Sequence, residues 1–443
     1  MAEFSRPQSE EAFEKNFAQI KPLMNETQAY YESSRCLFCY EAPCVNACPT
    51  GIDIPLFIRQ INTGNALGAA KTIYDANYFG NACGKVCPTE VLCEGACVYI
   101  HQDVKAIEIG RLQSFATTKA IVDHEQLFTP GADNGKKVAV IGAGPAGISC
   151  ACELRLKGYV VDIYEAKEKP SGLTIYGVAP YKIRNEEVLT EVDYLKRQLG
   201  FHINYNHPID SKEIVEQLEE DYGAIFLGIG LGETNNIELP GEDLENCLGA
   251  VEYIEALRMR HHEVGFGNKV VVLGAGNTAM DAASESARMG AEKVVLAYRR
   301  SKEQMRAYEF EYDLAKSVGV KGLFNVSPIE IVGDGKVEGV KFIRTKNENG
   351  KLTTVPNSEF LEPCDMVIRA TGQSKLVEFL SNIQGLELDN LDRIKVNYKN
   401  YQTTNAQYFA GGDAVNGGVE VVNAVAEGKI AALGIDKFLM SNE

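Results

Sequence analysis

The sequence predicts an α/β protein in which a helical, cysteine-rich N-terminal domain is followed by two Rossmann-like nucleotide-binding domains. Three observations support this fold class. Eight of the twelve cysteines lie in the first quarter of the chain, a glycine fingerprint occurs twice, and short apolar runs alternate with helical stretches beyond residue 130. Such alternation is typical of parallel sheets covered by helices.

The N-terminal cysteines form two runs, which read C-x2-C-x4-C-x3-C-P and C-x3-C-P-x5-C-x3-C. This spacing is typical of iron-sulfur ligation, because thiolates that are close in sequence on a bending backbone converge on one cluster. We therefore expect two 4Fe-4S clusters. Structural zinc is the alternative, but zinc sites usually pair two C-x2-C units and this region holds one. The first run consists of Cys36, Cys39, Cys44 and Cys48, and the second of Cys83, Cys87, Cys93 and Cys97.

Composition excludes several classes of function. The formal net charge of -17 and the pI near 5.0 argue against a nucleic-acid partner, because no basic surplus exists to release counterions. No apolar run approaches the ~20 residues that span a bilayer, and neither end carries a lipidation signal. The segment Met1–Phe17 is acidic and polar, unlike a signal peptide, and disulfides would need an oxidising compartment. A soluble, cytoplasmic protein is expected.

The linker Thr129–Lys137 is rich in turn formers and marks a domain boundary. Before it, stretches such as residues 54–74 are typical of short helices. After it, apolar runs predict strands at residues 138–141, 160–164, 224–229, 270–273, 294–298 and 366–370.

The first glycine fingerprint follows the predicted strand 138–141. Gly142 makes the tight turn, Gly144 lets the backbone approach a pyrophosphate, and Gly147 allows close packing of helix on strand. Glu165 ends the next strand, where an acid is expected to bind a ribose hydroxyl.

The second fingerprint has Gly274 and Gly276 in the first two roles and Ala279 in the third. The strand that follows ends in Arg299 and Arg300 instead of an acid. Guanidinium groups bind a ribose 2'-phosphate that a carboxylate would repel, so NADP(H) is favoured over NAD(H). The alternative is that both arginines are solvated surface residues. Arg306 is a candidate third contact.

The C-terminal stretch NAQYFAGGD predicts a strand before Gly412 and Asp413, with a helix from about Val421. It resembles the Gly-Asp of two-dinucleotide flavoproteins, in which the Asp bonds the flavin ribityl chain. The stretch from Ala370 through Thr371 to Gly372 resembles the turn where their nicotinamide domain returns to the flavin domain. This resemblance assigns FAD to the first fold and the nicotinamide to the second fold, inserted in the first. The implied domains are 1–130 (helical, with two 4Fe-4S clusters), 131–245 (FAD, first part), 246–372 (NAD(P)H) and 373–443 (FAD, second part).

The whole chain resembles the N-terminal half of dihydropyrimidine dehydrogenase and its separate bacterial FAD subunit, with the glutamate synthase small subunit as a close relative. The cysteine runs followed by Ile109–Gln113 (IGRLQ) and by the flavin fingerprint carry this resemblance. It implies one cluster held by Cys36, Cys39, Cys44 and Cys97, and a second held by Cys48, Cys87, Cys93 and Gln113. Cys83 would then be a free buried thiol, whereas spacing alone enlists all eight cysteines.

The resemblance also implies nucleotide contacts. The flavin contacts are Gly142, Ala143, Gly144, Pro145, Ala146, Glu165, Leu173 and Lys182. The nicotinamide contacts are Ala275, Gly276, Asn277, Thr278, Arg299, Arg300, Arg306, Ala370, Thr371 and Gly372. The chain departs from the family at Ser171, where Gly is usual, and at Ile183 and Arg184, where Leu-Pro is usual.

The chemistry that this resemblance implies needs no catalytic side chain, because hydride transfer from nicotinamide to flavin requires orientation and electrostatics. Electrons would leave through the clusters to an FMN- and iron-sulfur-bearing catalytic subunit that reduces uracil or thymine. The flavin mononucleotide barrel, the pyrimidine-binding loop and the amidotransferase nucleophile arrangement are not found in the sequence. The alternatives are the same module serving glutamate synthase or a ferredoxin, and a redox sensor or scaffold without turnover, which an intact nicotinamide fingerprint disfavours.

Overall fold

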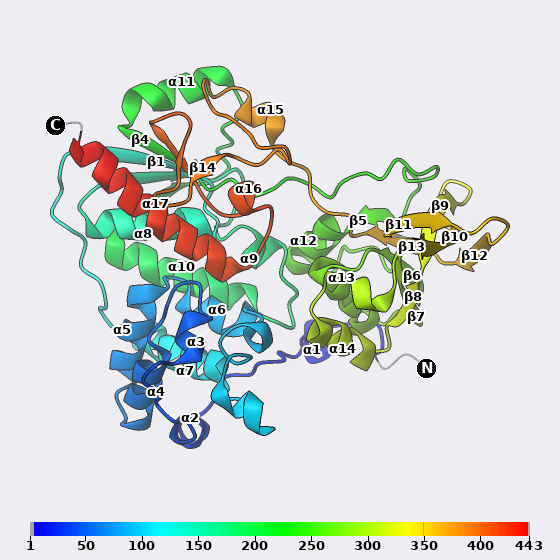
Figure 1. Ribbon diagram of the computed structural model, residues 1–443, viewed down its shortest axis with the longest axis horizontal. Helices are drawn as coiled ribbons and strands as arrows, with labels where there is room; N and C mark the ends of the chain where they lie inside the picture. Colours follow the sequence, from blue (N-terminus) through cyan, green and yellow to red (C-terminus); the bar gives the residue numbers. More distant parts are fainter. Residues whose placement is uncertain (1–3, 349, 442–443) are drawn as a thin grey trace. The chain divides into compact units, whose positions relative to one another are not determined.

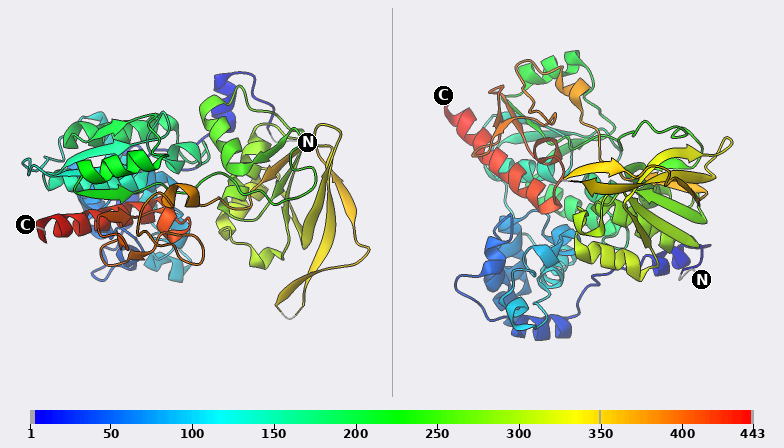
Figure 2. Two further views of the ribbon diagram at one scale, coloured as in Figure 1. Left: turned by 90° about the horizontal axis from the view of Figure 1, so that it is seen from above. Right: turned by 45° about the vertical axis from the view of Figure 1, so that its right-hand side comes forward.

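The computed structural model describes residues 4–348 and 350–441 and divides the chain into two compact units. The inserted unit consists of Met1–Ile20, Tyr176–Tyr181 and Gly232–Ser374, and the main unit consists of Lys21–Ile175, Lys182–Leu231 and Lys375–Glu443. Figures 1 and 2 show the elements of each unit. Within the described ranges, no helix has the length and apolar character needed to cross a membrane.

The main unit begins with the short helices that carry the cysteines (blue and cyan in Figure 1). The predicted helix over residues 54–74 is two helices, because Gly64 has a φ of 79° and the Asn65 side chain accepts a bond from Gly68 N at 2.9 Å, capping the second. The elements are α2 (Glu26–Ser34), α3 (Pro43–Asn46), α4 (Ile54–Asn62), α5 (Ala66–Ala76), α6 (Gly80–Val86) and α7 (Ile109–Val122), with 3-10 turns η1 (Thr89–Val91) and η2 (Val98–Gln102).

A seven-stranded sheet forms the rest of the main unit, in the order β14-β15-β16-β4-β1-β2-β3. The five strands from β16 to β3 are parallel, as the alternation of strands and helices predicts. Strands before and after the inserted unit share this sheet, so the second fold is inserted in the first. The strands are β1 (Lys137–Ile141), β2 (Val160–Tyr164), β3 (His202–Asn204), β4 (Ala224–Leu227), β14 (Val396–Asn397), β15 (Gln402–Thr403) and β16 (Tyr408–Ala410).

Helices α8 (Pro145–Leu156) and α17 (Val421–Ser441) pack closely against each other, which confirms the helix expected from about Val421. A Cβ on Gly428 would lie 2.1 Å from the Ala146 carbonyl oxygen, so only glycine allows this approach. The Ser149 hydroxyl donates to the Val425 carbonyl at 2.7 Å. The other helices of this unit include α10 (Asn185–Leu199), α11 (Lys212–Asp221), α15 (Val377–Leu380) and α16 (Asp413–Asn416).

The inserted unit contains a five-stranded parallel sheet in the order β5-β13-β6-β7-β8. Its strands are β5 (Cys247–Gly249), β6 (Lys269–Leu273), β7 (Lys293–Tyr298), β8 (Lys321–Phe324) and β13 (Met366–Arg369). Its helices are α1 (Glu10–Asn16), α12 (Ala250–Arg260), α13 (Asn277–Arg288) and α14 (Glu309–Ser317), with the 3-10 turn η3 (Lys302–Gln304). All six strands predicted from apolar runs are present in the two parallel sheets.

A second, antiparallel sheet of the inserted unit was not predicted. It is built from β9 (Val326–Val332), β10 (Gly339–Glu348), β11 (Lys351–Thr354) and β12 (Phe360–Pro363), with β10 paired to the other three. These strands are largely half-exposed, so their sequences lack the continuous apolar runs of the parallel strands.

The N-terminal segment lies in the inserted unit, although the sequence places it in a helical domain 1–130. Phe13 and Phe17 are buried in an apolar cluster with Tyr181, Leu257 and Met289. Two aromatic residues in an otherwise polar segment are enough to anchor it to this unit. The expected nicotinamide domain, residues 246–372, lies within the longer range Gly232–Ser374 of the inserted unit.

Candidate functional site

The first glycine fingerprint forms the turn between β1 and α8. Gly142 has a φ of 97°, and a Cβ there would lie 2.4 Å from the Gly228 carbonyl oxygen. A Cβ on Gly147 would lie 2.0 Å from the Gly142 carbonyl oxygen. Gly144, the N-cap of α8, has no atom nearer than 3.8 Å to such a Cβ. The first and third glycines are therefore needed for packing, and the second leaves the helix N-terminus open to an anion, as predicted.

Glu165 follows β2 and is buried beside this turn. One carboxylate oxygen accepts from Ala143 N at 2.8 Å and the other from Lys167 N at 2.9 Å. Burial raises the pKa of Glu165, and these two bonds offset part of that effect. Each oxygen keeps a further lone pair. Glu165 therefore fixes the loop and can still accept from ribose hydroxyls.

The segment that departs from the family pattern closes over the fingerprint. Ser171 has a φ of 85°, a region that favours glycine, and its backbone N donates to the Ala143 carbonyl at 2.6 Å. A Cβ on Gly172 would lie 3.3 Å from Gly144 Cα. Among the described residues, the buried hydroxyls of Ser171 and Thr174 have no hydrogen-bond partner. Two unpaired buried hydroxyls beside an open helix N-terminus suit a polar ligand such as a dinucleotide.

Leu173 and Lys182 flank the helix that follows. Leu173 opens α9 (Leu173–Tyr176) and Lys182 is buried. The sequence analysis missed Thr174, for which the sequence gave no signal beyond its place next to the expected contact Leu173.

Gly412 and Asp413 lie against the same fingerprint. Gly412 has a φ of 74°, and a Cβ there would be 3.2 Å from Ala146 Cβ. Its backbone N donates to Glu427 on α17 at 2.6 Å. Asp413 begins α16, and burial raises its pKa. The structure thus brings the predicted C-terminal Gly-Asp to the first fingerprint, and Glu427, which holds the turn, was not predicted.

The second fingerprint lies between β6 and α13 of the inserted unit. Gly274 has a φ of 145°, and a Cβ there would lie 2.4 Å from the Ala370 carbonyl oxygen. A Cβ on Gly276 would meet no atom within 4 Å, so the N-terminus of α13 is open. The Ala275 carbonyl accepts from Arg306 N at 3.1 Å and Asn277 Oδ1 from Tyr308 N at 3.1 Å, while Thr278 is half-buried on α13.

The arginines after β7 are held by their backbones and not by their side chains. The Thr345 hydroxyl donates to the Arg299 carbonyl at 2.7 Å, and Asn325 N donates to the Arg300 carbonyl at 3.1 Å. Within the described part of the chain, no carboxylate forms an ion pair with Arg299, Arg300 or Arg306. The three guanidinium groups are thus available to an anionic ligand.

The turn after β13 is fixed by Asn235. Thr371 Oγ1 donates to the Asn235 carbonyl at 2.9 Å, and Asn235 N donates to the Gly372 carbonyl at 2.9 Å. Ala370 N donates to the Leu273 carbonyl at 2.8 Å, next to Gly274. The turn and the second fingerprint are thus neighbours, as predicted, whereas Asn235 was not predicted.

The cysteines gather in two groups that cross the two runs. Burial raises the pKa of Cys36, and the neighbouring Cys39 and Cys97 raise it further. Burial, with Cys36 and Cys97, raises the pKa of Cys44 to about 12. The first group is therefore Cys36, Cys39, Cys44 and Cys97.

The second group forms around Cys87. A hydrogen bond with Cys83 and burial raise the pKa of Cys87, and the nearby Cys93 and Cys48 add to this. Burial, together with Glu94 and Cys48, raises the pKa of Cys93. No disulfide links these thiols. Thiols that raise one another's pKa need a cation to become thiolates together, and an iron-sulfur cluster supplies that charge.

Gln113 lies on α7, which packs tightly on α6. A Cβ on Gly84 of α6 would lie 2.4 Å from Ser114 Oγ. Gln113 is buried, and its Nε2 donates to the Gly80 carbonyl at 2.6 Å. That bond commits the amide nitrogen and leaves the oxygen as the atom able to ligate a metal. Cys83 remains beside Cys87, so both candidate ligands are near the second group.

Two cations near the cysteines were not predicted. Lys21 Nζ donates to the Cys87 carbonyl at 3.2 Å and to Thr89 Oγ1 at 2.8 Å. Arg59 lowers the pKa of Cys36, against the larger effect of burial. Positive charge beside each group favours thiolates and an anionic cluster. Neither cation lies in a cysteine run, so spacing gives no signal for them.

Comparison with known proteins agrees with this geometry. Residues 13–125 match the model of the family described as dihydropyrimidine dehydrogenase domain II, 4Fe-4S cluster, and residues 136–428 match the pyridine nucleotide-disulphide oxidoreductase family.

Three known proteins illustrate these relationships. The glutamate synthase [NADPH] small chain of Escherichia coli (strain K12) is 34% identical over 96% of this chain and 94% of its own length. The NAD-dependent dihydropyrimidine dehydrogenase subunit PreT of the same organism is 32% identical, over 95% of this chain and 97% of its own. The structure of Mycobacterium tuberculosis FprA in complex with NADPH shares the fold, with a TM-score of 0.57 and 19% identity over 69% of this chain and 85% of that one. The chain therefore belongs to the pyridine nucleotide-disulphide oxidoreductase family, joined to an iron-sulfur domain of the dihydropyrimidine dehydrogenase type, and is an NAD(P)H-dependent flavin and iron-sulfur oxidoreductase.

Proposed function

We propose that this chain is the electron-input subunit of a dihydropyrimidine dehydrogenase, in which a partner subunit bearing FMN and iron-sulfur clusters reduces uracil or thymine. The observation that carries the proposal is the crossed grouping of the cysteines in the same compact unit as the FAD fingerprint. Seven cysteines and Gln113 provide two sets of four ligands, which is what two 4Fe-4S clusters require. Chain and cofactors together then form a path for electrons from a nucleotide to an external acceptor.

The side chains serve to bind and orient. When bound, FAD accepts a hydride from NAD(P)H, and clusters carry the electrons onward singly. The N-terminus of α8 and Glu165 hold the flavin nucleotide, and Asp413 is placed to accept from its ribityl hydroxyls. The N-terminus of α13 receives the nicotinamide nucleotide pyrophosphate. A general acid or base is not required, because no proton must be delivered to a particular atom for hydride transfer.

The uncommitted arginines favour NADP(H) over NAD(H). A 2'-phosphate has charge for guanidinium groups to pair with, whereas a ribose hydroxyl has none. In our proposal, Arg299 and Arg300 contact the 2'-phosphate and Arg306 supports them.

A second candidate function is that of a glutamate synthase small chain. The 34% identity over 96% of the chain to the Escherichia coli small chain favours it. In that case the input reaction is the same, and the partner uses the electrons for glutamate formation. The two functions differ in the partner alone.

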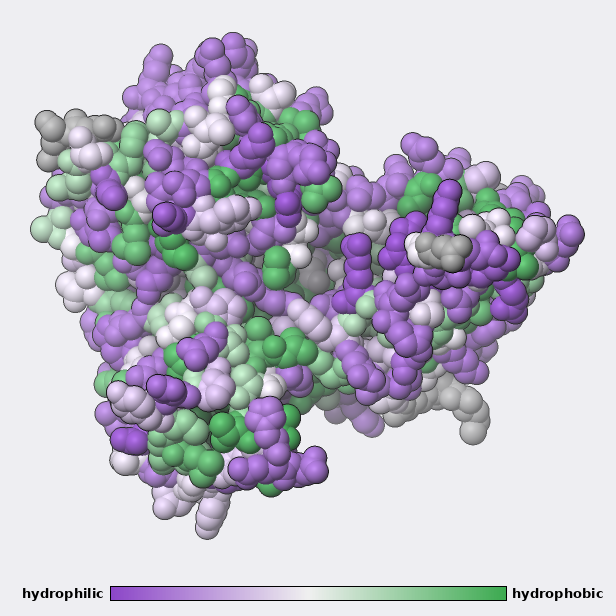
Figure 3. Space-filling model, viewed as in Figure 1, coloured by the Kyte–Doolittle hydropathy of each residue, from purple (hydrophilic) through white to green (hydrophobic). Residues whose placement is uncertain are grey.

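The surface beside the first cysteine group suits a partner. Leu37 lies between two cysteines of that group and is exposed, and Tyr40, next to Cys39, is fully exposed. In Figure 3, apolar and polar atoms are mixed at the lower left, over the cysteine-bearing helices of Figure 1. Exposed aromatic residues are typical anchors of protein interfaces. An electron acceptor docking here would lie near the first cluster.

The experiment that tests the function is affinity purification of the tagged chain from its native cell, with identification of the bound protein. Co-purification of an FMN-barrel subunit, and uracil reduction by the reconstituted pair, would support the proposal. Co-purification and activity with a glutamine-hydrolysing subunit would assign the chain to glutamate synthase instead.

The docking surface has its own matched variants. Tyr40→Asp should weaken the complex, whereas Tyr398→Asp, at another exposed tyrosine of the main unit, should not. The iron content of both variants must equal that of the wild type, so that a lost cluster is not mistaken for a lost contact. Equal partner affinity for the two variants would place the interface elsewhere.

A further inference from the structure

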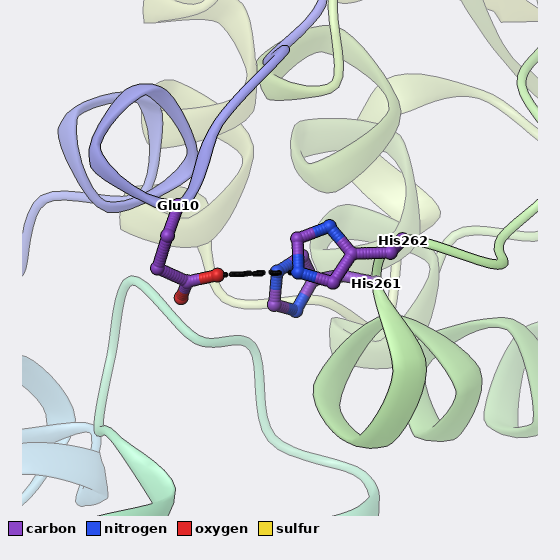
Figure 4. Close-up of side chains that lie close together, drawn as sticks. All are labelled: Glu10, His261 and His262. Carbon is purple, nitrogen blue, oxygen red and sulfur yellow. Dashed lines mark hydrogen bonds and ion pairs between the residues drawn. The ribbon is translucent and has the colours of Figure 1, made fainter.

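Three metal-ligating side chains meet in the inserted unit, away from both fingerprints and from the cysteines. Glu10 is the first residue of α1, and His261 and His262 follow α12 (Figure 4). Glu10 Oε2 lies 2.8 Å from His261 Nε2 and 3.4 Å from His262 Nε2. The three potential ligand atoms all lie within 4.8 Å of one another.

Packing holds this arrangement in place. The His261 ring stacks on Phe13, with ring centroids 4.1 Å apart and an interplanar angle of 16°. Phe13 is buried and stacks in turn on Phe17, at 4.4 Å. His262 and Glu10 are exposed, so they can adjust their side chains and a hydrated ion can reach them. One ligand is thus fixed by the apolar cluster and two are adaptable.

The donor set has the chemistry of a zinc site. Two imidazole nitrogens and one carboxylate oxygen suit Zn²⁺, which commonly takes three protein ligands and a water. Ligand atoms bound at about 2.0 to 2.2 Å around a tetrahedral ion lie about 3.3 to 3.6 Å apart. The 3.4 Å separation already falls in this range, and the 2.8 Å separation reaches it with a movement of about half an ångström by Glu10.

We propose that Glu10, His261 and His262 bind a zinc ion that fastens the N-terminal helix to the inserted unit. The site would join residues 251 positions apart in sequence. It would add to the bonds between Asn16 and Arg288, in which Asn16 Nδ2 donates to the Arg288 carbonyl at 2.7 Å. An ion that binds the folded state stabilises it by mass action. Electron transfer does not require this ion, so the site has a structural role that the proposed function does not include.

The test uses the holoprotein, with FAD and both clusters in place so that the cysteines are occupied. Zinc bound per chain is measured by equilibrium dialysis over micromolar free Zn²⁺, and iron is measured in the same samples. We expect one saturable site in the wild type and in His202→Ala, which removes an exposed histidine outside the site. His262→Ala and Glu10→Gln should each weaken zinc binding by at least about tenfold.

Thermal unfolding of the same proteins provides a second measurement. Zinc should raise the unfolding temperature of the wild type and of His202→Ala, but not that of His262→Ala. If the wild type shows no saturable zinc site, or if His262→Ala binds zinc as tightly as the wild type does, the three residues form an ion pair and not a metal site. Because Glu10 and His262 are exposed, neither substitution removes packing.

Discussion

Cys97, the last cysteine of the second run, lies beside Cys36, the first cysteine of the first run. Burial raises the pKa of the Cys36 thiol, and Cys39 and Cys97 raise it further. This contact crosses the sequence order of the two runs. It leaves Cys48, at the end of the first run, with Cys87 and Cys93 of the second. Each proposed cluster therefore draws ligands from both runs, and neither run can form its cluster alone.

The crossed grouping predicts different effects for two neighbouring cysteines. Anaerobically purified protein should hold about eight irons per chain, from two four-iron clusters. Cys83→Ala should leave the iron content unchanged, whereas Cys87→Ala and Gln113→Ala should each lose about half of it. Iron analysis and low-temperature electron paramagnetic resonance of the reduced proteins measure this. Equal iron loss from Cys83→Ala and Cys87→Ala would show that Gln113 is not a ligand.

The uncommitted arginines predict the choice of nucleotide. Replacing Arg299 and Arg300 together by Gln should raise the KM for NADPH far more than the KM for NADH. Two charge-assisted bonds of about 1.5 to 3 kcal/mol each correspond to about two orders of magnitude in affinity, after allowance for non-additivity. Steady-state kinetics with ferricyanide as acceptor measures the ratio. A wild type that prefers NADH, with kinetics unchanged by the double substitution, would make both arginines plain surface charges.

Glu191 predicts how stability depends on pH. It is buried on α10 and accepts bonds from Asn81 N at 2.6 Å, Ala82 N at 2.9 Å and the Tyr74 hydroxyl at 3.0 Å, so it joins the nucleotide fold to the cysteine-bearing α6. Burial raises the pKa of Glu191 to about 7, from an ordinary value of 4.5. The folded state thus binds this proton more tightly than the unfolded state does. Its contribution is fully present below about pH 4.5 and is lost as the pH rises to about 7, with a total on the order of 3 kcal/mol.

Glu191→Gln isolates this effect. The variant should be less stable by about 1 to 3 kcal/mol, because its amide cannot accept all three bonds, but the decline in stability between about pH 4.5 and 7 should be smaller than in the wild type. The measurement is the unfolding temperature across this range for both proteins. Parallel pH profiles for the two proteins would contradict the raised pKa.

Local sequence features predicted the parts of the fold that depend on local chemistry. The runs that became β1, β2, β4, β6, β7 and β13 are apolar because both faces of a parallel sheet are buried. The fingerprint glycines follow from close backbone approaches, as at Gly142 and Gly274. The sheet of β9 to β12 escaped prediction because its strands are half-exposed and its pattern is weak.

Long-range contacts were beyond the reach of spacing. The crossed cysteine grouping depends on how α6 packs on α7, where Gly84 meets Ser114. Only the resemblance to a known family predicted that grouping, whereas counting along the chain enlists Cys83. Glu10 and the two histidines of α12 carry no motif that relates them. Ser171 keeps a conformation that favours glycine, which explains why its family usually has Gly there.

The central claim is that this chain takes electrons from a reduced nicotinamide nucleotide and passes them to a partner without transforming the final substrate itself. The most direct test is an anaerobic turnover assay of the isolated holoprotein, with ferricyanide or with uracil or thymine as acceptor. We predict oxidation of NADPH with ferricyanide, no reduction of either pyrimidine alone, and pyrimidine reduction when an FMN-barrel subunit is added. Reduction of a pyrimidine by the isolated chain, or failure to oxidise NADPH or NADH with ferricyanide, would contradict the claim.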